Sequence, residues 1–384
     1  MNPYKQLQRT CWLAFISIGL TACGGDSDNS STAADALDDN VDEVAENTYQ
    51  TLSVNAASYE NWKYVNLTEG TVLDLDEESA ATSLNWHIAL RRTEIKLNGG
   101  VSGSGSVTAA VADMQEEFYD AEGIADVSVF TNADADIEVQ ALAVAYDVSA
   151  LTYQTDTYEP ALTDWYVYNT TTHQIGANTD VGYLLRHADG VTYSKLMIDA
   201  VSYTDISVRY EIQAEDTVQF AGGEHTFSAE FTDDATELCL DLDTESAIDC
   251  TSSGDWDLRY EVNLSGRAIN IWTNGGVYGV GNGAVFGSID AIELAEYTSA
   301  TNLDSYDISG HYLQDSSHSI FADSSWYAYN LNGSHKLWPN FRTYLINLDS
   351  ADEASIKIAL QVANYYSLGD SGSPELRFQN LVTE

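Results

Sequence analysis

Basic side chains are scarce in this sequence. Its 384 residues contain 15 Lys and Arg against 60 Asp and Glu, which gives a formal net charge of −45. Such a field repels the phosphates of nucleic acids and anionic lipid surfaces. The composition therefore argues against a nucleic-acid partner and leaves cationic partners open. Acidic side chains also keep a protein soluble, so the net charge alone does not identify a function.

Long apolar runs are also missing. A short run from Trp12 to Leu20 follows Lys5 and Arg9 and is too short for a permanent transmembrane helix. This order of residues predicts a secretory signal peptide over residues 1–22. The sequence Leu20-Thr21-Ala22-Cys23 resembles a bacterial lipobox, which implies lipidation of Cys23 and stable attachment to a membrane through two or more acyl chains. The alternative is an ordinary cleaved signal followed by a chance cysteine.

The segment after Cys23 contains no basic residue. Residues 24–50 are rich in Gly, Ser, Ala and Asn and include eight Asp or Glu. Such a composition buries too little apolar area to order itself. We therefore predict a flexible acidic tether over residues 23–50. Loss of Lys5 and Arg9 with the signal peptide would take the net charge from −45 to −47.

Familiar catalytic motifs are absent from the sequence. It contains no Gly-x-Ser-x-Gly elbow in a strand-to-helix context and no His-Glu-x-x-His zinc helix, so we expect a protein that is not an enzyme. The Gly-rich residues 275–283 lack the Lys-Ser/Thr ending of a phosphate loop and are interpreted as turns between strands. Asn132, Asp134 and Asp136 alternate as in the start of a calcium loop, but the glycine and terminal Glu of an EF-hand are missing.

Proline and cysteine are rare, with four of each. Amphipathic stretches with a 3.6-residue period are also few, although residues 107–119 are expected to form a short helix. Residues 193–198 and 355–360 instead alternate with a period of two, which is typical of β-strands. We predict an all-β fold. Cys11 leaves with the signal peptide, and Cys239 and Cys250, at the ends of an expected hairpin, are predicted to form a disulfide.

The chain beyond the tether repeats itself. The repeated motifs recur in the same order at offsets of 161 to 176 residues. This spacing indicates whole domains and predicts two tandem antiparallel β domains, residues 51–212 and 213–384. The matching segments are residues 73–76 and 240–243, Trp86 and Trp256, Asn98-Gly99-Gly100 and Asn274-Gly275-Gly276, and the Trp-Tyr-x-Tyr-Asn motifs at 165–169 and 326–330.

Two of the seven histidines recur in register. His173 lies eight residues after Trp165, and His335 lies nine residues after Trp326. A neutral imidazole can coordinate haem iron, but it can also hold a turn by a hydrogen bond. His187 and His225 are expected at the surface.

The order of these motifs, together with the lipobox, resembles the HmuY family of haem-binding lipoproteins. The resemblance implies an all-β domain shaped like a hand, which holds haem between finger-like loops and passes it to an outer-membrane receptor. It also implies attachment to the outer membrane by lipid. Gly24 at the position after Cys23, where lipoproteins that are retained carry Asp, fits outward sorting.

On this basis we expect a membrane-anchored lipoprotein that captures haem and delivers it to an uptake system. The alternative is a carbohydrate- or protein-binding surface β module without haem that uses its Trp and Tyr side chains for stacking. The residues expected at the site are His335 with His311 or His318 as iron ligands in the second domain, His173 with Met114 or Met197 in the first, and an aromatic pocket of Trp165, Tyr168, Trp326 and Tyr329.

Overall fold

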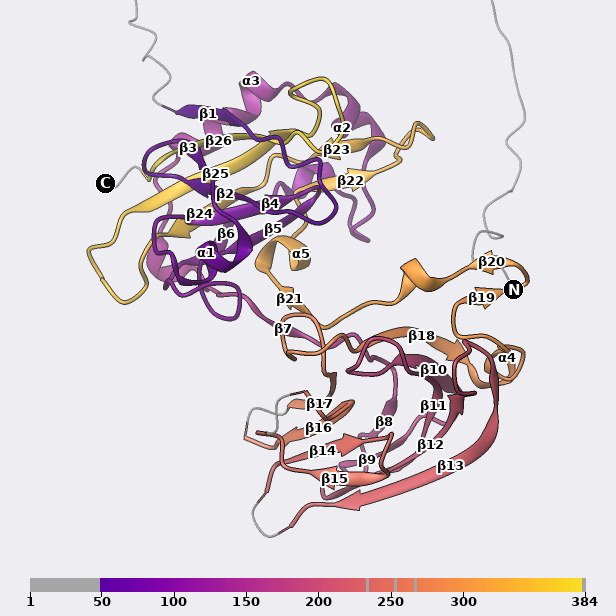
Figure 1. Cartoon of the computed structure of the whole chain (residues 1–384). Helices are drawn as coiled ribbons and strands as arrows, with labels where there is room; N and C mark the ends of the chain where they lie inside the picture. The colour runs from indigo at the N-terminus through magenta and orange to yellow at the C-terminus, as the bar shows by residue number, and fades with distance from the viewer. Residues whose placement is uncertain (1–48, 233–234, 252–253, 266–267, 382–384) are drawn as a thin grey trace, which may run out of the picture. The chain divides into compact units, whose positions relative to one another are not determined.

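The computed structural model describes residues 49–232, 235–251, 254–265 and 268–381 (Figure 1). The predicted signal peptide, Cys23 and nearly all of the predicted tether lie outside these residues. The all-β prediction is confirmed, because antiparallel strands form all the larger sheets. Within the described residues, no helix combines the length and the apolarity needed to span a membrane.

A first pair of sheets joins strands from both ends of the chain, and we call it lobe one. Figure 1 shows the indigo strand β1 in one sheet with the yellow strands β26 and β25, and β1 pairs with β26. The side chains between its two sheets form one apolar core that includes Val65, Leu90, Tyr344 and Leu360. The five-stranded sheet has the order β1 (Gln50–Ser53), β26 (Glu375–Asn380), β25 (Lys357–Asn364), β24 (Thr343–Asn347) and β6 (Thr108–Asp113), and the four-stranded sheet has the order β3 (Thr71–Leu73), β2 (Lys63–Asn66), β4 (Ile88–Arg91) and β5 (Glu94–Leu97).

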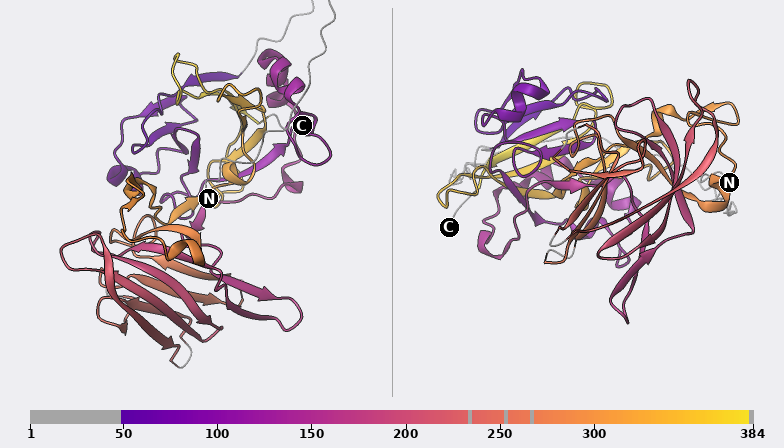
Figure 2. Two further views of the ribbon diagram at one scale, coloured as in Figure 1. Left: turned by 90° about the vertical axis from the view of Figure 1, so that its right-hand side faces the viewer. Right: turned by 60° about the horizontal axis from the view of Figure 1, so that its bottom comes forward.

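A second pair of sheets, lobe two, is built from the middle of the chain. Its core includes Leu185, Leu196, Leu240 and Leu258, and its strands are drawn in magenta to orange in Figures 1 and 2. The five-stranded sheet has the order β13 (Phe220–Glu230), β12 (Asp205–Gln213), β11 (Tyr193–Val201), β10 (Val181–Arg186) and β18 (Ala284–Asp290), and the four-stranded sheet has the order β15 (Ser246–Ile248), β14 (Glu237–Asp241), β16 (Leu258–Asn263) and β17 (Ala268–Thr273).

Short elements complete both lobes. Helix α1 begins after Asp76, whose carboxylate accepts a hydrogen bond from the Ser79 amide at 2.8 Å and so caps the helix. The remaining elements are the helices α2 (Val127–Asn132), α3 (Ala135–Glu138), α4 (Ala291–Leu294) and α5 (Ile320–Asp323), with α1 spanning Glu77–Thr82; the 3-10 helices η1 (Glu116–Phe118), η2 (Val139–Ala143), η3 (Val148–Ala150) and η4 (Ser309–His311); and the strand pairs β7 (Thr157–Glu159) with β21 (Ser316–His318), β8 (Tyr166–Asn169) with β9 (Gln174–Ala177), β19 (Asn302–Leu303) with β20 (Tyr306–Asp307), and β22 (Tyr327–Tyr329) with β23 (Leu337–Pro339).

The helix predicted over residues 107–119 does not form, so this prediction is wrong. Residues 108–113 form strand β6, which pairs with β24, and only Glu116–Phe118 make a 3-10 turn. Pairing with a strand more than 200 residues away overrides the local preference of this segment for a helix.

The two lobes have the same strand order but a different chain order. Strands β1 to β6 of lobe one correspond to β13 to β18 of lobe two, and β24 to β26 correspond to β10 to β12. Even an irregularity recurs, because the β25–β26 register shifts between Val362 and Asn364 and the β11–β12 register shifts between Ile198 and Ala200. Each lobe is therefore one copy of the same double sheet.

This correspondence corrects the predicted boundary between residues 212 and 213. Each sequence unit divides into a leading half, residues 49–156 or 216–315, and a trailing half, residues 157–215 or 316–381. Lobe one combines the leading half of the first unit with the trailing half of the second, and lobe two combines the other two halves. Motif order along the chain survived duplication, but it does not determine which strands pair.

Two of the repeated motifs keep their structural role. The Asn98 side chain donates to the Trp86 carbonyl at 2.8 Å, and the Asn274 side chain donates to the Trp256 carbonyl at 2.9 Å. The Gly-rich loop folds around Asn274, whose side-chain oxygen accepts from the Val280 and Gly281 amides. The loop is thus a turn between strands, as predicted. Residues 73–76 and 240–243 differ in place, since the former follow β3 and the latter leave β14.

The predicted disulfide is confirmed. Cys239 in β14 and Cys250 after β15 are joined, with their Cα atoms 5.2 Å apart. The bond closes the β14–β15 hairpin, in which Cys239 pairs with Ile248.

Candidate functional site

The two Trp-Tyr-x-Tyr-Asn motifs form equivalent hairpins, β8–β9 in lobe two and β22–β23 in lobe one. Trp165 and Trp326, each next to the first strand, are 2% and 1% exposed and anchor the hairpins in the two cores. Trp326 also donates from its indole nitrogen to the Thr93 carbonyl at 3.1 Å. The predicted aromatic pocket therefore divides, because the two tryptophans are core residues and the tyrosines are exposed.

Each hairpin presents a tyrosine–histidine pair to solvent. Tyr168 and Tyr329 are 50% and 57% exposed. The Tyr168 hydroxyl lies 2.8 Å from Nδ1 of His173, and the Tyr329 hydroxyl lies 2.9 Å from Nδ1 of His335. The same pair thus recurs in both sequence units.

The backbone fixes these histidines at the hairpin turns. His173 and His335 have φ angles of 56° and 54°, in the left-handed region that few residues other than glycine adopt. The His173 amide donates to the Asn169 carbonyl, and the His335 amide donates to the Asn330 side chain, both at 2.8 Å. Such conformations persist where surrounding contacts hold them, and they are frequent at functional sites.

The ring geometry leaves a nitrogen available for coordination. When Nδ1–H donates to the tyrosine oxygen, the lone pair of Nε2 is directed away from the hydrogen bond and is free to bind a metal. An exposed imidazole beside exposed aromatic rings suits a planar ligand that carries iron. The residues present at both hairpins therefore fit a haem group.

The other predicted ligands are placed differently. His318 has Nδ1 3.3 Å from Glu159 and Nε2 2.7 Å from Asp323. Burial acts to lower the pKa of His318, but hydrogen bonds to these two carboxylates raise it. Both ring nitrogens are engaged, so His318 is not free to coordinate iron in this arrangement.

His311 lies on η4, with Nε2 3.2 Å from the Tyr306 hydroxyl and its ring near Phe286. Within the described part of the chain, no hydrogen bond, ion pair or ring contact links His335 to either His311 or His318. The pairing of His335 with His311 or His318 as iron ligands therefore stays a prediction.

The two methionines differ in availability. Met114 is 41% exposed, whereas the Met197 sulfur accepts a hydrogen bond from Arg209 at 3.4 Å. Asp134, part of the calcium-like pattern, caps helix α3 by accepting from the Asp136 amide. The Asp134 carboxylate in that pattern therefore serves local helix structure.

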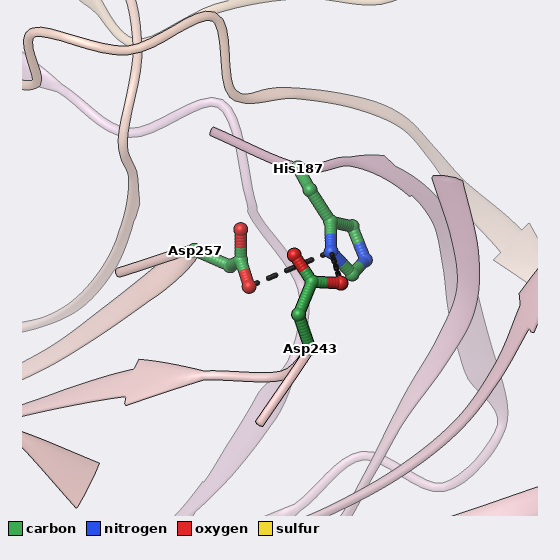
Figure 3. Close-up of side chains that lie close together, drawn as sticks. All are labelled: His187, Asp243 and Asp257. Carbon is green, nitrogen blue, oxygen red and sulfur yellow. Dashed lines mark hydrogen bonds and ion pairs between the residues drawn. The ribbon is translucent and has the colours of Figure 1, made fainter. Parts of the chain in front are cut away.

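His225 lies at the surface as predicted, with its side chain 40% exposed, but the surface position predicted for His187 is wrong. His187 is fully buried directly after β10. Its Nδ1 lies 3.0 Å from Asp243 and 3.5 Å from Asp257, and these three residues are the one group of metal-ligand type found among the described residues (Figure 3). Its acidic partners Asp243 and Asp257 lie in the other sequence unit, so no local motif signals the cluster.

Hydrogen bonds account for the whole cluster. His187 Nε2 lies 3.0 Å from the Ser194 hydroxyl, and the two oxygens of Asp257 accept from the Ala188 amide at 3.0 Å and the Leu242 amide at 2.9 Å. Burial acts to lower the pKa of His187, but the hydrogen bond to Asp243 and the charges of Asp257 and Asp243 raise it. Burial raises the pKa of Asp257, opposed chiefly by the charge of His187. With a protonated imidazole, His187 and Asp257 form a buried ion pair.

The fold and the hairpins define a class of protein, an all-β protein that presents histidine and tyrosine on exposed hairpins. Residues 58–215 match the family model described as HmuY protein, and this segment belongs to that family. The match spans the leading and trailing halves of the first sequence unit, which lie in different lobes.

Two solved structures are similar to the chain. A proposed HmuY-like heme-binding protein from Bacteroides vulgatus has 10% identity and a TM-score of 0.31, covering 88% of this chain and 94% of its own. A proposed lipoprotein from Bacteroides fragilis has 11% identity and a TM-score of 0.33, covering 88% of this chain and 95% of its own. A search of curated proteins finds no match. Because both TM-scores are low, the family assignment rests on residues 58–215.

Proposed function

We propose that this protein is a lipid-anchored haem-binding protein of the outer membrane, which captures haem and delivers it to an uptake system. The observation that supports haem is the Tyr–His pair, which recurs with the same geometry on the exposed hairpins of both lobes. Membership of residues 58–215 in the HmuY family supports the same ligand. The function is binding, without catalysis.

His173 and His335 would each offer the Nε2 nitrogen to the iron of a bound haem. The iron then supplies the coordination bond, and the protein supplies orientation through Tyr168 and Tyr329, which hold the rings. The exposed aromatic surface of each hairpin would cover part of the porphyrin. With 60 acidic residues in the chain, electrostatics gives no help to the propionates, so affinity rests on ligation and apolar contact.

A hemin titration followed by absorption tests this function. The unmodified protein is expected to give a sharp Soret band. His173→Ala and His335→Ala should each weaken binding at lobe two and lobe one respectively by at least about tenfold, because each loses a metal bond. His225→Ala, a matched change of an imidazole held by Glu245 at 2.6 Å, should leave the titration unchanged.

The result also decides between the candidate functions. Unchanged titrations for the His173→Ala/His335→Ala double variant would refute these ligands. Failure of the unmodified protein to take up hemin would favour the binding module without haem, in which Tyr166, Tyr168 and Tyr329 stack on a carbohydrate or a protein.

The lipid anchor has its own test. Cys23→Ser should move the protein from the membrane fraction to the soluble fraction, because the thiol that accepts the lipid is lost. Circular dichroism should show that the β-sheets remain. If the Cys23→Ser protein still sediments with membranes, the anchor lies elsewhere.

A further inference from the structure

The ion pair in lobe two joins the two sequence units. His187 belongs to the trailing half of the first unit, and Asp257 belongs to the leading half of the second (Figure 3). Through its two oxygens Asp257 also holds the Ala188 amide of the first unit and the Leu242 amide of the second. This contact thus lies where the two halves of the lobe meet.

Lobe one has different side chains at the equivalent positions. His87 directly precedes β4, as Asp257 directly precedes β16, and its Nδ1 accepts from the Leu67 amide at 3.0 Å, as Asp257 accepts from Leu242. Burial lowers the pKa of His87 to about 4, so this imidazole is neutral at neutral pH.

Leu348 takes the position of His187. It follows β24, and its amide donates to the Ile356 carbonyl at 3.2 Å, as the His187 amide donates to the Thr192 carbonyl at 2.9 Å. Lobe one therefore combines a neutral histidine with a leucine, where lobe two combines a histidine of raised pKa with a carboxylate.

The alternative pairing of halves would mismatch these side chains. Because both lobes share strand order and the same register shift, the backbone of either trailing half could complete either leading half. Pairing within one sequence unit would place His187 next to His87 and Asp257 next to Leu348. A buried carboxylate without a cationic partner is costly.

We propose that the His187–Asp257 ion pair is the specificity-determining contact through which the two sequence units exchange halves. Buried ion pairs add little net stability over apolar packing, but they penalise partners that leave a charge unpaired. The cluster is less suited to binding a metal ion, because both nitrogens of His187 and both oxygens of Asp257 already have hydrogen-bond partners.

Engineered disulfides can report which halves pair. Ser53 in β1 pairs with Glu375 in β26, and Ser207 in β12 takes the place of Glu375 in lobe two. Residues directly opposite on antiparallel strands have the Cα separation that a disulfide requires. Ser53→Cys/Glu375→Cys should link only when the halves are exchanged, and Ser53→Cys/Ser207→Cys should link only when they are not.

The experiment uses the full chain with Cys11 and Cys23 replaced by Ser. Each reporter protein is unfolded, refolded under oxidising conditions and mapped by mass spectrometry of its disulfide-linked peptides. In the otherwise unmodified sequence, the 53–375 link should form and the 53–207 link should be undetectable. A predominant 53–207 link would overturn the exchanged arrangement.

Two variants test the ion pair itself. His187→Leu/Asp257→His gives both lobes the leucine–histidine combination, and His87→Asp/Leu348→His gives both lobes the ion pair. Either change removes the discrimination, so the 53–207 link should rise to a level comparable with the 53–375 link. The second variant keeps every buried charge partnered in both arrangements, so it answers the question if the first does not fold.

Glu211→Gln is the matched control. It removes a 2.8 Å ion pair with Lys195 that lies entirely within one trailing half, and the 53–375 link should remain exclusive. If both lobe-symmetrising variants also keep the 53–375 link exclusively, the ion pair does not select the arrangement.

Discussion

At the scale of single residues, each leading half ends on a buried aspartate whose carboxylate accepts a hydrogen bond from a backbone amide of its own four-stranded sheet. Asp156 accepts from the Leu97 amide at 2.9 Å, and Asp315 accepts from the Thr273 amide at 2.8 Å and the Ala161 amide at 2.7 Å. Gly276, with φ 64°, passes so close that a Cβ atom would lie 2.0 Å from the Asp315 carbonyl oxygen. Only glycine fits there, which explains this part of the Asn-Gly-Gly motif.

Asp315 makes stability depend on pH. Burial raises its pKa to about 6, opposed by its hydrogen bonds to Ala161 and Thr273. As pH rises from 4 to 7, the unfolded chain releases this proton first, so the folded state loses stability. Between pH 4 and 7, the free energy of unfolding of the unmodified protein should fall by on the order of 2–3 kcal/mol more than that of Asp315→Asn.

Urea unfolding at several pH values measures this difference. Asp304→Asn, at an exposed position, is the control and should keep the pH dependence of the unmodified protein. Parallel stability curves for the unmodified protein and Asp315→Asn would show that Asp315 does not titrate with a raised pKa.

Local motifs were predictable at this scale, and distant partners were not. Trp86, Asn98, Trp256 and Asn274 were found because their motifs recur in both units, and the structure adds the Trp–Asn hydrogen bonds. His187 was placed at the surface because its partner Asp243 lies 56 residues away in another unit. Local sequence pattern does not show which charge from a distant unit meets the residue after Arg186.

At the scale of elements, equivalent hairpins are held in different ways. By register, Tyr64 of the β2–β3 hairpin takes the place of Cys239 in the β14–β15 hairpin. Tyr64 packs edge-on against Trp86 with ring centroids 5.1 Å apart. A disulfide holds the lobe-two hairpin instead, so its contribution can be measured there.

Removal of that disulfide should destabilise lobe two. Cys239 and Cys250 are 11 residues apart in sequence, and closing a loop of this size stabilises the folded state by about 3 kcal/mol in the chain-entropy view. Cys239→Ser/Cys250→Ser should lower the free energy of unfolding in urea by that order. The unmodified protein under reducing conditions should behave like the variant, and equal stability with and without reductant would contradict the prediction.

Strands and turns followed from the sequence more reliably than strand partners did. The period of two identified the strands at 193–198 and 355–360, and the turn-rich spacing identified the hairpins. The sequence repeat relates β24 to β10, so the strand pattern does not determine which of the two lies beside β6. Duplication makes the two equivalent, so only side chains at the junction can distinguish them.

At the scale of the whole molecule, the structure makes fragments informative. Residues 157–318 contain every strand of lobe two and the His187–Asp257 pair. They should fold alone with a cooperative unfolding transition. Residues 213–384 contain one copy of each corresponding large-sheet strand, but they place Asp257 next to Leu348 and lack His187.

The fragment 213–384 should therefore be less stable than 157–318, by at least about 1–3 kcal/mol, because its buried carboxylate has no cationic partner. Leu348→His should recover part of this difference by supplying an imidazolium at the position of His187, whereas Leu368→His, at an exposed position, should recover none. Circular dichroism during urea unfolding at pH 6 measures all four proteins. Equal stability of the two unmodified fragments, with no gain from Leu348→His, would show that the sheets pair without regard to this contact.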